Sequence, residues 1–280
     1  MATCEAGGYR VERAGDFAFA VAEKTYEGCT TCRGTGLISR DTVDHGRTYE
    51  VSAPCERRLL TDRLAIFNSA SIPAVHGQAT FDAYKPATQE QAQALKKARD
   101  FVQLWPGARG LVLSGPVGTG KTHLLAAILK QLCIERGVRA SYVEISLLYA
   151  TIRRGFAEGK SGGEIIGPLS KIELLAIDEL GKGRGSPFEL ETLDELIARR
   201  YNAGKITLFA TNFSLRAPEE KAMGMIQTAD LKDAGKDSRL LCDRVGDRIY
   251  SRLCELCDFV EFPPGTPDKR RARLAAELRR

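Results

Sequence analysis

The chain has 280 residues, of which 43% are hydrophobic and 28% are charged, and its formal net charge is +5. These values are typical of a soluble globular protein. No apolar run is long enough to span a membrane, and residues 1–10 lack an apolar core behind a basic start, so we expect no membrane segment and no secretory signal, and we expect a cytoplasmic location.

Residues 1–76 differ in composition from the rest of the chain and are expected to form a small separate module. They hold many turn residues and several of the 8 cysteines. Cys29 and Cys32 have the spacing of a pair of zinc ligands, and Cys55 follows as a third thiol. Because no secretory signal precedes them, metal binding or simple burial is favoured over disulfides. Cys133, Cys254 and Cys257 lie in apolar surroundings and are interpreted as buried thiols.

Strand and helix patterns alternate after a turn-rich connector over residues 77–90. The predicted order is helix 87–104, strand 110–114, helix 121–136, strand 138–145, strand 172–178, helix 187–202, strand 205–211, helix 237–253 and strand 258–262. Ser146 is expected to cap a helix, and Ser186 with Glu189 has the form of a capping box. Strands that alternate with helices predict an α/β fold with a parallel sheet covered on both faces.

The segment GPVGTGKT matches the pattern G-x-x-x-x-G-K-[ST] between a predicted strand and a predicted helix. Backbone N–H groups and a helix N-terminus can surround a triphosphate there, provided that glycines keep side chains away. Lys121 would contact the β- and γ-phosphates of ATP, and the Thr122 hydroxyl would bind Mg²⁺. The predicted nucleotide-binding residues are Gly115, Pro116, Val117, Gly118, Thr119, Gly120, Lys121 and Thr122.

Polar residues follow two of the predicted strands. Asp178 and Glu179 end the apolar strand 172–178, where Asp178 would complete the Mg²⁺ site and Glu179 would orient and deprotonate the attacking water. Asn212 follows the strand 205–211 and would bond the γ-phosphate or the water, because parallel strands end at one edge of a sheet. The alternatives are a pair of exposed loop acids and an asparagine that serves only as a turn residue.

A P-loop, an Asp-Glu pair and a later asparagine in this order resemble the AAA+ ATPases. From about residue 72 to 262 the chain resembles the DnaC/DnaI-like replicative helicase loaders, with the IstB-like transposition ATPases as close relatives. The segments that carry this resemblance are IPAVHGQATFDAYKP, GPVGTGKTHLLAAI, LLAIDELG, LFATNFSL and RVGDRIYSRL. The resemblance implies an AAA+ P-loop fold with a central parallel sheet, ATP-dependent binding of single-stranded DNA, and delivery of a replicative helicase.

The resemblance also implies roles for individual residues. Arg252 would be an arginine finger that acts on the ATP of a neighbouring subunit, with Arg248 as the second choice, which implies self-association. Arg270 loosely matches a nucleotide-sensing arginine. The implied catalytic set is Lys121, Asp178, Glu179, Asn212 and Arg252.

An extra helix in these loaders contacts single-stranded DNA, and the corresponding segment here is about 147–168. Arg153, Arg154 and Phe156 lie in it, and cations beside an aromatic ring suit a phosphate backbone and a stacked base. The alternative is the face of an ordinary amphipathic helix.

Some of these loaders carry a small zinc module that closes with Pro-Cys-x-Cys. Pro54 and Cys55 are present here, but Arg57 stands in place of the last cysteine. The expected Zn²⁺ ligands are therefore Cys29, Cys32, His45 and Cys55, with Cys4 as the alternative to His45.

We therefore predict a partner-binding module over residues 1–76 and an AAA+ ATPase domain over residues 77–280 that load a replicative helicase. One alternative is an IstB-like transposition helper ATPase. A second is a P-loop small-molecule kinase, which would leave Asn212 and an arginine acting in trans without a role. A third is a zinc adaptor with a vestigial nucleotide site. The intact Lys121 and Glu179 argue against this alternative.

Overall fold

The computed structural model describes residues 5–215 and 240–271. The chain divides into two compact units. The smaller unit is Met1–Gln78 with Lys130–Arg139, and the larger unit is Ala79–Leu129 with Ala140–Arg280. Each unit is described by itself below.

A 5-stranded sheet forms the centre of the larger unit, in the order β6-β7-β8-β5-β9. Its strands are β5 (Gly110–Ser114), β6 (Ala140–Glu144), β7 (Leu174–Asp178), β8 (Ile206–Thr211) and β9 (Cys257–Glu261). All neighbouring strands are parallel, and every residue of β5 and β7 is buried. This parallel pairing confirms the predicted α/β fold with a central parallel sheet. Continuously apolar strands are expected in such a sheet, because both of its faces are covered.

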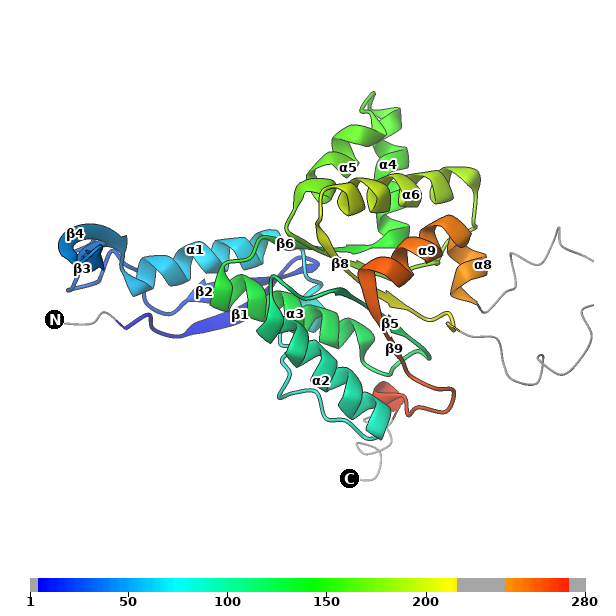
Figure 1. Cartoon of the computed structure of the whole chain (residues 1–280), viewed down its shortest axis with the longest axis horizontal. Coiled ribbons are helices and arrows are strands. Elements are labelled where there is room, and N and C mark those ends of the chain that lie inside the picture. The colour runs from blue at the N-terminus through cyan, green and yellow to red at the C-terminus, as the bar shows by residue number, and fades with distance from the viewer. Residues whose placement is uncertain (1–4, 216–239, 272–280) are drawn as a thin grey trace, which may run out of the picture. The chain divides into compact units, whose positions relative to one another are not determined.

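Helices cover both faces of this sheet (Figure 1). On one face lie α4 (Ile145–Ala157), α5 (Gly162–Lys171), α6 (Pro187–Asn202) and α9 (Asp247–Leu256), after the short α8 (Leu241–Val245). On the other lie α2 (Gln89–Leu104) and the first part of α3 (Lys121–Arg136), which contributes to both units. The core of the first face joins Ile177 and Phe209 of the sheet to Leu193 and Leu253 of the helices. Within the described residues, no helix combines the length and the apolar character needed to cross a bilayer.

The predicted capping box at the start of α6 is present. The Ser186 side chain accepts from the Glu189 N–H, and the Glu189 carboxylate accepts from the Ser186 N–H. The prediction for Ser146 was wrong, because Glu144 is the N-cap residue of α4 and the Ser146 hydroxyl donates to Glu144 Oε1 at 2.6 Å.

Two predicted helical segments are divided. The segment 147–168 contains parts of both α4 and α5, since Ser161 caps a new helix by accepting from Glu164 N–H. The predicted helix 237–253 is interrupted at Gly246, whose φ of 81° is incompatible with a continuous right-handed helix. Residues 237–239 of that prediction lie outside the described residues.

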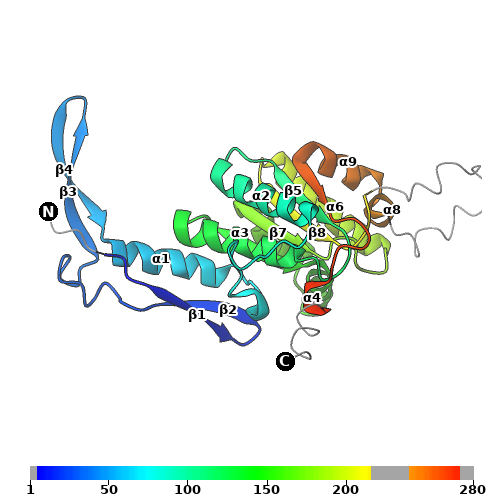
Figure 2. The same cartoon turned by 90° about the horizontal axis from the view of Figure 1, so that it is seen from below.

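The smaller unit combines two β-hairpins with one helix. It comprises β1 (Tyr9–Ala14), β2 (Phe17–Ala22), β3 (Leu37–Asp44), β4 (Arg47–Pro54), α1 (Glu56–Ser69) and the 3₁₀ turn η1 (Ala74–His76). α1 packs on β2, and the Asn68 amide exchanges two hydrogen bonds with the backbone of Ala20, at 2.6 and 3.0 Å. The β3–β4 hairpin is a separate ribbon whose residues are mostly exposed (Figure 2).

Candidate functional site

The glycine-rich loop joins β5 to α3, and its glycines have a conformation that other residues avoid. The φ angles of Gly115, Gly118 and Gly120 are 132°, 81° and 97°. A Cβ on Gly115 would lie 2.3 Å from the Phe262 carbonyl oxygen, and one on Gly120 would lie 2.5 Å from the Tyr84 ring. The loop therefore requires glycine both for its backbone angles and for close approach of neighbouring groups.

Lys121 begins α3 and is 7% exposed. Its ammonium donates to the carbonyl oxygens of Gly115 and Pro116, both at 2.7 Å. Burial lowers the pKa of Lys121 to about 8; the nearby charge of Asp178 opposes this change and that of Arg270 adds to it. The ammonium thus lies within the loop, bonded to carbonyls that phosphate oxygens can replace as partners.

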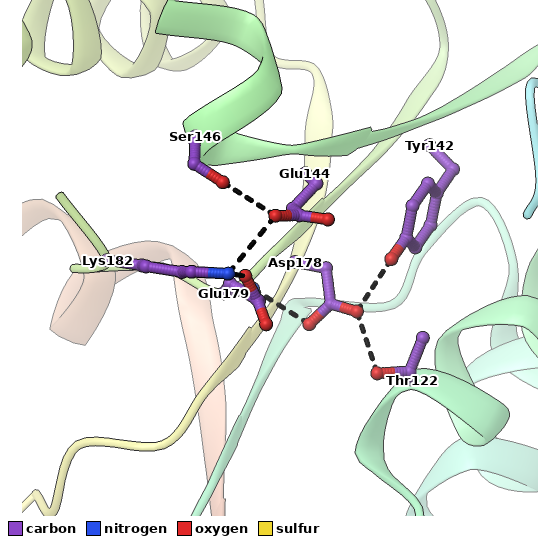
Figure 3. A network of polar contacts seen from close by, with 7 residues as sticks. All are labelled: Thr122, Tyr142, Glu144, Ser146, Asp178, Glu179 and Lys182. Atoms are coloured by element: carbon purple, nitrogen blue, oxygen red, sulfur yellow. Dashed lines mark hydrogen bonds and ion pairs between the residues drawn. The ribbon is translucent and has the colours of Figure 1, made fainter.

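Asp178 ends β7 and is 5% exposed. Its Oδ2 accepts from the hydroxyls of Thr122 and Tyr142, both at 2.7 Å, and its Oδ1 accepts from the Glu179 N–H at 2.8 Å (Figure 3). Burial, together with the charge of Asp178, raises the pKa of Tyr142, so this phenol stays a donor. The sequence reasoning missed Tyr142, whose only signal is a polar tip within an apolar strand.

The Thr122 hydroxyl and the Asp178 carboxylate fit a Mg²⁺ site. They are adjacent hard oxygen ligands at the start of a helix and the end of a strand, which suits an ion that binds few protein groups and keeps several waters. The two predicted ligands thus lie in contact, and their binding of Mg²⁺ stays a prediction.

Glu179 follows Asp178 with a φ of 56°. Its carboxylate contacts the ammonium of Lys182, which also lies 3.3 Å from Glu144 Oε1 (Figure 3). Burial raises the pKa of Glu179, Lys182 opposes that rise, and Glu144 adds to it. Sequence reasoning missed Lys182 and Glu144, because their meeting depends on the turn after β7 and on the pairing of β6 with β7.

Asn212 directly follows β8 and is exposed. β8 lies between β7 and β5, so Asn212 stands at the sheet edge that also bears Asp178 and the glycine-rich loop. Its hydrogen bond to the γ-phosphate or to the attacking water stays a prediction.

The two arginines considered as a finger differ in exposure. The Arg252 side chain is 20% exposed and bonds to Asp194 of α6 in the same chain. Arg248 is 75% exposed, and its Nη1 lies 3.5 Å from the other oxygen of Asp194. Arg248 is therefore the more accessible of the two.

Arg153 and Phe156 of α4 meet Phe188, near the start of α6, which the sequence reasoning had not selected. The Arg153 guanidinium carbon lies 5.8 Å from the Phe188 ring centroid, and the Phe156 and Phe188 centroids are 6.0 Å apart. Phe156 is 50% exposed, and Arg154 is exposed on the same helix. The two rings and Arg153 thus share one region of the surface, where Arg153 also lies 3.6 Å from the Glu189 carboxylate.

Two other segments contact the glycine-rich loop, and neither contact was predicted. The Tyr84 hydroxyl donates to the Thr119 carbonyl oxygen at 2.9 Å, and the Lys269 N–H donates to that of Gly118 at 3.0 Å. The Lys269 ammonium lies 3.3 Å from the Tyr84 ring centroid. The charge of Arg270, the next residue, contributes to the lowered pKa of Lys121, and its nucleotide-sensing role stays a prediction.

Three buried thiols gather in the smaller unit. The sulfur atoms of Cys29, Cys32 and Cys55 all lie within 4.8 Å of one another. Thiolates on one tetrahedral Zn²⁺ at about 2.3 Å are roughly 3.8 Å apart, so the three sulfurs fit such a site with small movements. Burial raises the pKa of the Cys32 thiol, and a bound cation would reverse that effect.

His45 is not the fourth ligand, so that prediction was wrong. It lies at the tip of the β3–β4 hairpin, where its side chain is 95% exposed and 3.7 Å from Asp44. Cys55 follows the base of the same hairpin, where Leu37 pairs with Pro54. Strands rise about 3.3 Å per residue, so the ribbon separates His45 from the thiols by roughly 23 Å.

The alternative ligand, Cys4, lies outside the described residues. Arg57, which stands where a cysteine was expected, donates to the carbonyl oxygens of Glu5 at 3.4 Å and Gly28 at 3.2 Å. It therefore joins the chain beside residue 4 to the loop that carries Cys29.

The remaining thiols were predicted to be buried. Cys133 and Cys257 are buried, as expected, but Cys254 is exposed on α9. The apolar neighbours of Cys254 in the sequence point to the other face of this amphipathic helix, where Ile249 and Leu253 are buried.

A comparison with known protein families supports an ATP-binding site. Residues 22–237 match the family described as IstB-like ATP binding protein. The replicative helicase loader DnaC of Escherichia coli (strain K12) is 30% identical over 151 residues, which are 53% of this chain and 61% of that protein. The chain thus spans about three fifths of the length of this curated relative.

Two solved structures share the fold. The crystal structure of the DnaC helicase loader superposes with a TM-score of 0.56 and 27% identity, covering 68% of this chain and 99% of that one. The crystal structure of DnaI superposes with a TM-score of 0.50 and 23% identity, covering 69% and 93%.

Proposed function

The chain belongs to the family of IstB-like ATP binding proteins, and from this premise we propose that it is an ATPase that delivers a replicative helicase to single-stranded DNA. The observation that carries the ATPase is the group formed by Lys121, Thr122, Asp178 and Glu179 at one edge of the sheet. The similarity to DnaC in sequence and in structure supports the loader.

In the proposed reaction, the γ-phosphoryl group of ATP passes to water. Lys121 exchanges its loop carbonyls for phosphate oxygens and stabilises their charge. Thr122 and Asp178 would hold Mg²⁺, which supplies further positive charge to the phosphates when it is bound. Glu179 takes the proton of the attacking water, which its raised pKa favours. Tyr142 keeps Asp178 oriented throughout.

Single-stranded DNA would bind across α4 and the start of α6. Phe156 and Phe188 offer ring faces and edges to bases, while Arg153 and Arg154 offer charge to phosphates. Phe188 extends the predicted set, since it contacts both Arg153 and Phe156.

Self-association would place an arginine of one subunit on the ATP of the next. The exposure of Arg248 favours it over Arg252, which bonds to Asp194 of its own chain. Arg248 also lies 3.5 Å from Asp194, but its side chain is 75% exposed against 20% for Arg252 and can turn toward another subunit, so Arg248 becomes our first choice.

The smaller unit would bind the helicase and hold Zn²⁺ at Cys29, Cys32 and Cys55. Its exposed ribbon presents Val43, Tyr49 and Val51, large apolar side chains that a partner would cover. Cys4, the alternative to His45, becomes the proposed fourth ligand.

A loading assay tests this function. The protein, a replicative helicase from the same host and ATP are mixed with closed circular single-stranded DNA, and helicase retained on the circle is counted. Helicase retention that requires both this protein and ATP supports the loader. Retention that is equally high when this protein is left out, or when ATP is left out, contradicts it. One rival is an IstB-like transposition helper ATPase, because residues 22–237 match the family of IstB-like ATP binding proteins. Binding to a transposase encoded nearby, with no helicase retention, would select that rival.

A further inference from the structure

Lys182 lies between two carboxylates next to the catalytic edge. Its ammonium contacts Glu179 and lies 3.3 Å from Glu144 Oε1 (Figure 3). Glu144 also accepts a hydrogen bond from the Ser146 hydroxyl at 2.6 Å. One cation is therefore shared by the proposed general base and by a second acid on the neighbouring strand.

The backbone that carries Glu179 and Lys182 is held in a tight turn. The Lys182 N–H donates to the Glu179 carbonyl oxygen at 2.9 Å. Arg244 of α8 donates to the carbonyl oxygens of Gly181 at 3.1 Å and Gly183 at 2.6 Å. A Cβ on Gly181 would lie 3.0 Å from the Phe213 ring, so this close approach requires glycine. The side chains of Glu179 and Lys182, which are 31% and 54% exposed, are the parts of this turn that can move.

The direction of the Glu179 side chain decides whether it can act as the general base. In the view of Figure 3, the group of Glu144, Lys182 and Glu179 lies on one side of Asp178, and Thr122 lies on the other. ATP would bind on the Thr122 side, where the hydroxyl marks the Mg²⁺ position. A carboxylate in an ion pair with Lys182 is held by that pair and must leave it before it can accept the proton of the attacking water.

We propose that Lys182 is a positioning residue that holds Glu179 in a resting arrangement and thereby restrains ATP hydrolysis. This inference rests on the proposed ATPase function. Hydrolysis requires the Glu179 carboxylate to leave Lys182, and Glu144 then keeps the ammonium paired. Glu144 thus competes with Glu179 for Lys182, so the release of Glu179 from Lys182 costs little free energy.

The competition predicts that Lys182→Ala and Glu144→Gln change kcat in opposite directions. Lys182→Ala removes the resting partner, so kcat rises by about two- to fivefold, the range expected for an exposed ion pair, with little change in KM. Glu144→Gln leaves Glu179 as the remaining charged partner of Lys182, so kcat falls by about the same factor. Lys182→Arg keeps the cation and retains the wild-type rate. The double variant Lys182→Ala/Glu179→Gln is inactive, because the gain acts through Glu179.

The control is Lys97→Ala, which removes a lysine of similar exposure, 52% against 54%, that pairs with Asp258. Steady-state ATP hydrolysis by the full chain gives kcat and KM for all variants, and a fluorescent ATP analogue checks that each variant binds nucleotide. A Lys182→Ala rate equal to or below that of the wild type, while Lys97→Ala is unchanged, overturns the inference and leaves the ATPase intact. A wild-type protein that binds ATP without hydrolysing it overturns the proposed function and this inference with it.

Discussion

Tyr142 of β6 donates a 2.7 Å hydrogen bond to Oδ2 of Asp178, the last residue of the neighbouring strand β7. The same oxygen accepts from Thr122, so a buried phenol orients the carboxylate that is proposed to hold Mg²⁺. Strand pairing brings the two residues together, since Tyr142 and Ala176 are register partners.

Tyr142→Phe should weaken catalysis without unfolding the protein. It removes one hydrogen bond to a buried charged group and keeps the ring, so we expect kcat/KM to fall about tenfold and more Mg²⁺ to be required. The control is Tyr201→Phe, which removes a hydroxyl bonded at 2.8 Å to the carboxylate of Glu255 on the surface. Equal Mg²⁺ titrations of ATP hydrolysis for the two variants would show that Tyr142 does not orient Asp178.

Phe188→Ala should weaken binding of single-stranded DNA by at least about fivefold, because base stacking on an aromatic ring contributes roughly 1–3 kcal/mol. Arg153→Ala should also weaken it and should reduce the salt dependence, since fewer counterions are released. The matched control is Arg99→Ala, which removes a cation 6.0 Å from the Phe81 ring on another part of the same unit. Fluorescence anisotropy with an oligonucleotide measures all three. If Arg99→Ala weakens binding as much as the other two, the DNA site lies elsewhere.

Arg248→Ala should bind ATP normally but hydrolyse it roughly 10³-fold more slowly or worse, as when arginine fingers are lost in other phosphoryl-transfer enzymes. Mixing it with Lys121→Ala should restore part of the activity, because each protein supplies what the other lacks. Arg252→Ala is the comparison, since its guanidinium bonds to Asp194 within the chain. Recovery with Arg252→Ala and none with Arg248→Ala, in assemblies of equal size, would return the role to Arg252.

Metal analysis of protein purified without chelators should find about one zinc per chain. The double variant Cys29→Ser/Cys32→Ser should lose it, because two of three clustered thiols are removed. Cys4→Ser should lower the zinc content as well, whereas His45→Ala and Cys254→Ser should leave it unchanged. Wild-type zinc content in the double variant would refute the site.

The larger unit was predictable because its signals are local. Strands such as β5 and β7 are continuously apolar, and the loop pattern from Gly115 to Thr122 specifies its own turn and helix start. Buried parallel strands that end at one edge then bring Lys121, Asp178 and Asn212 to the same region.

The features that could not be predicted from the sequence depend on tertiary contacts. The hairpin of β3 and β4 is exposed on both faces, so it lacks the alternation that marks a strand, and the distance from His45 to Cys55 could not be inferred. Gly246 interrupts a segment whose apolar spacing predicts one helix. The contacts of Lys182 with Glu144 and of Phe188 with Phe156 join elements far apart in sequence.

The most direct test of the central claim compares ATP binding and ATP hydrolysis for Glu179→Gln and Lys121→Ala. Glu179→Gln keeps the shape of the side chain but not its basicity, so it should bind ATP as the wild type does and hydrolyse it at least roughly a hundredfold more slowly. Lys121→Ala should not bind ATP, since the ammonium beside Gly115 and Pro116 is lost. Fluorescent-ATP titration and phosphate release measure the two properties. Normal turnover by Glu179→Gln would contradict the account.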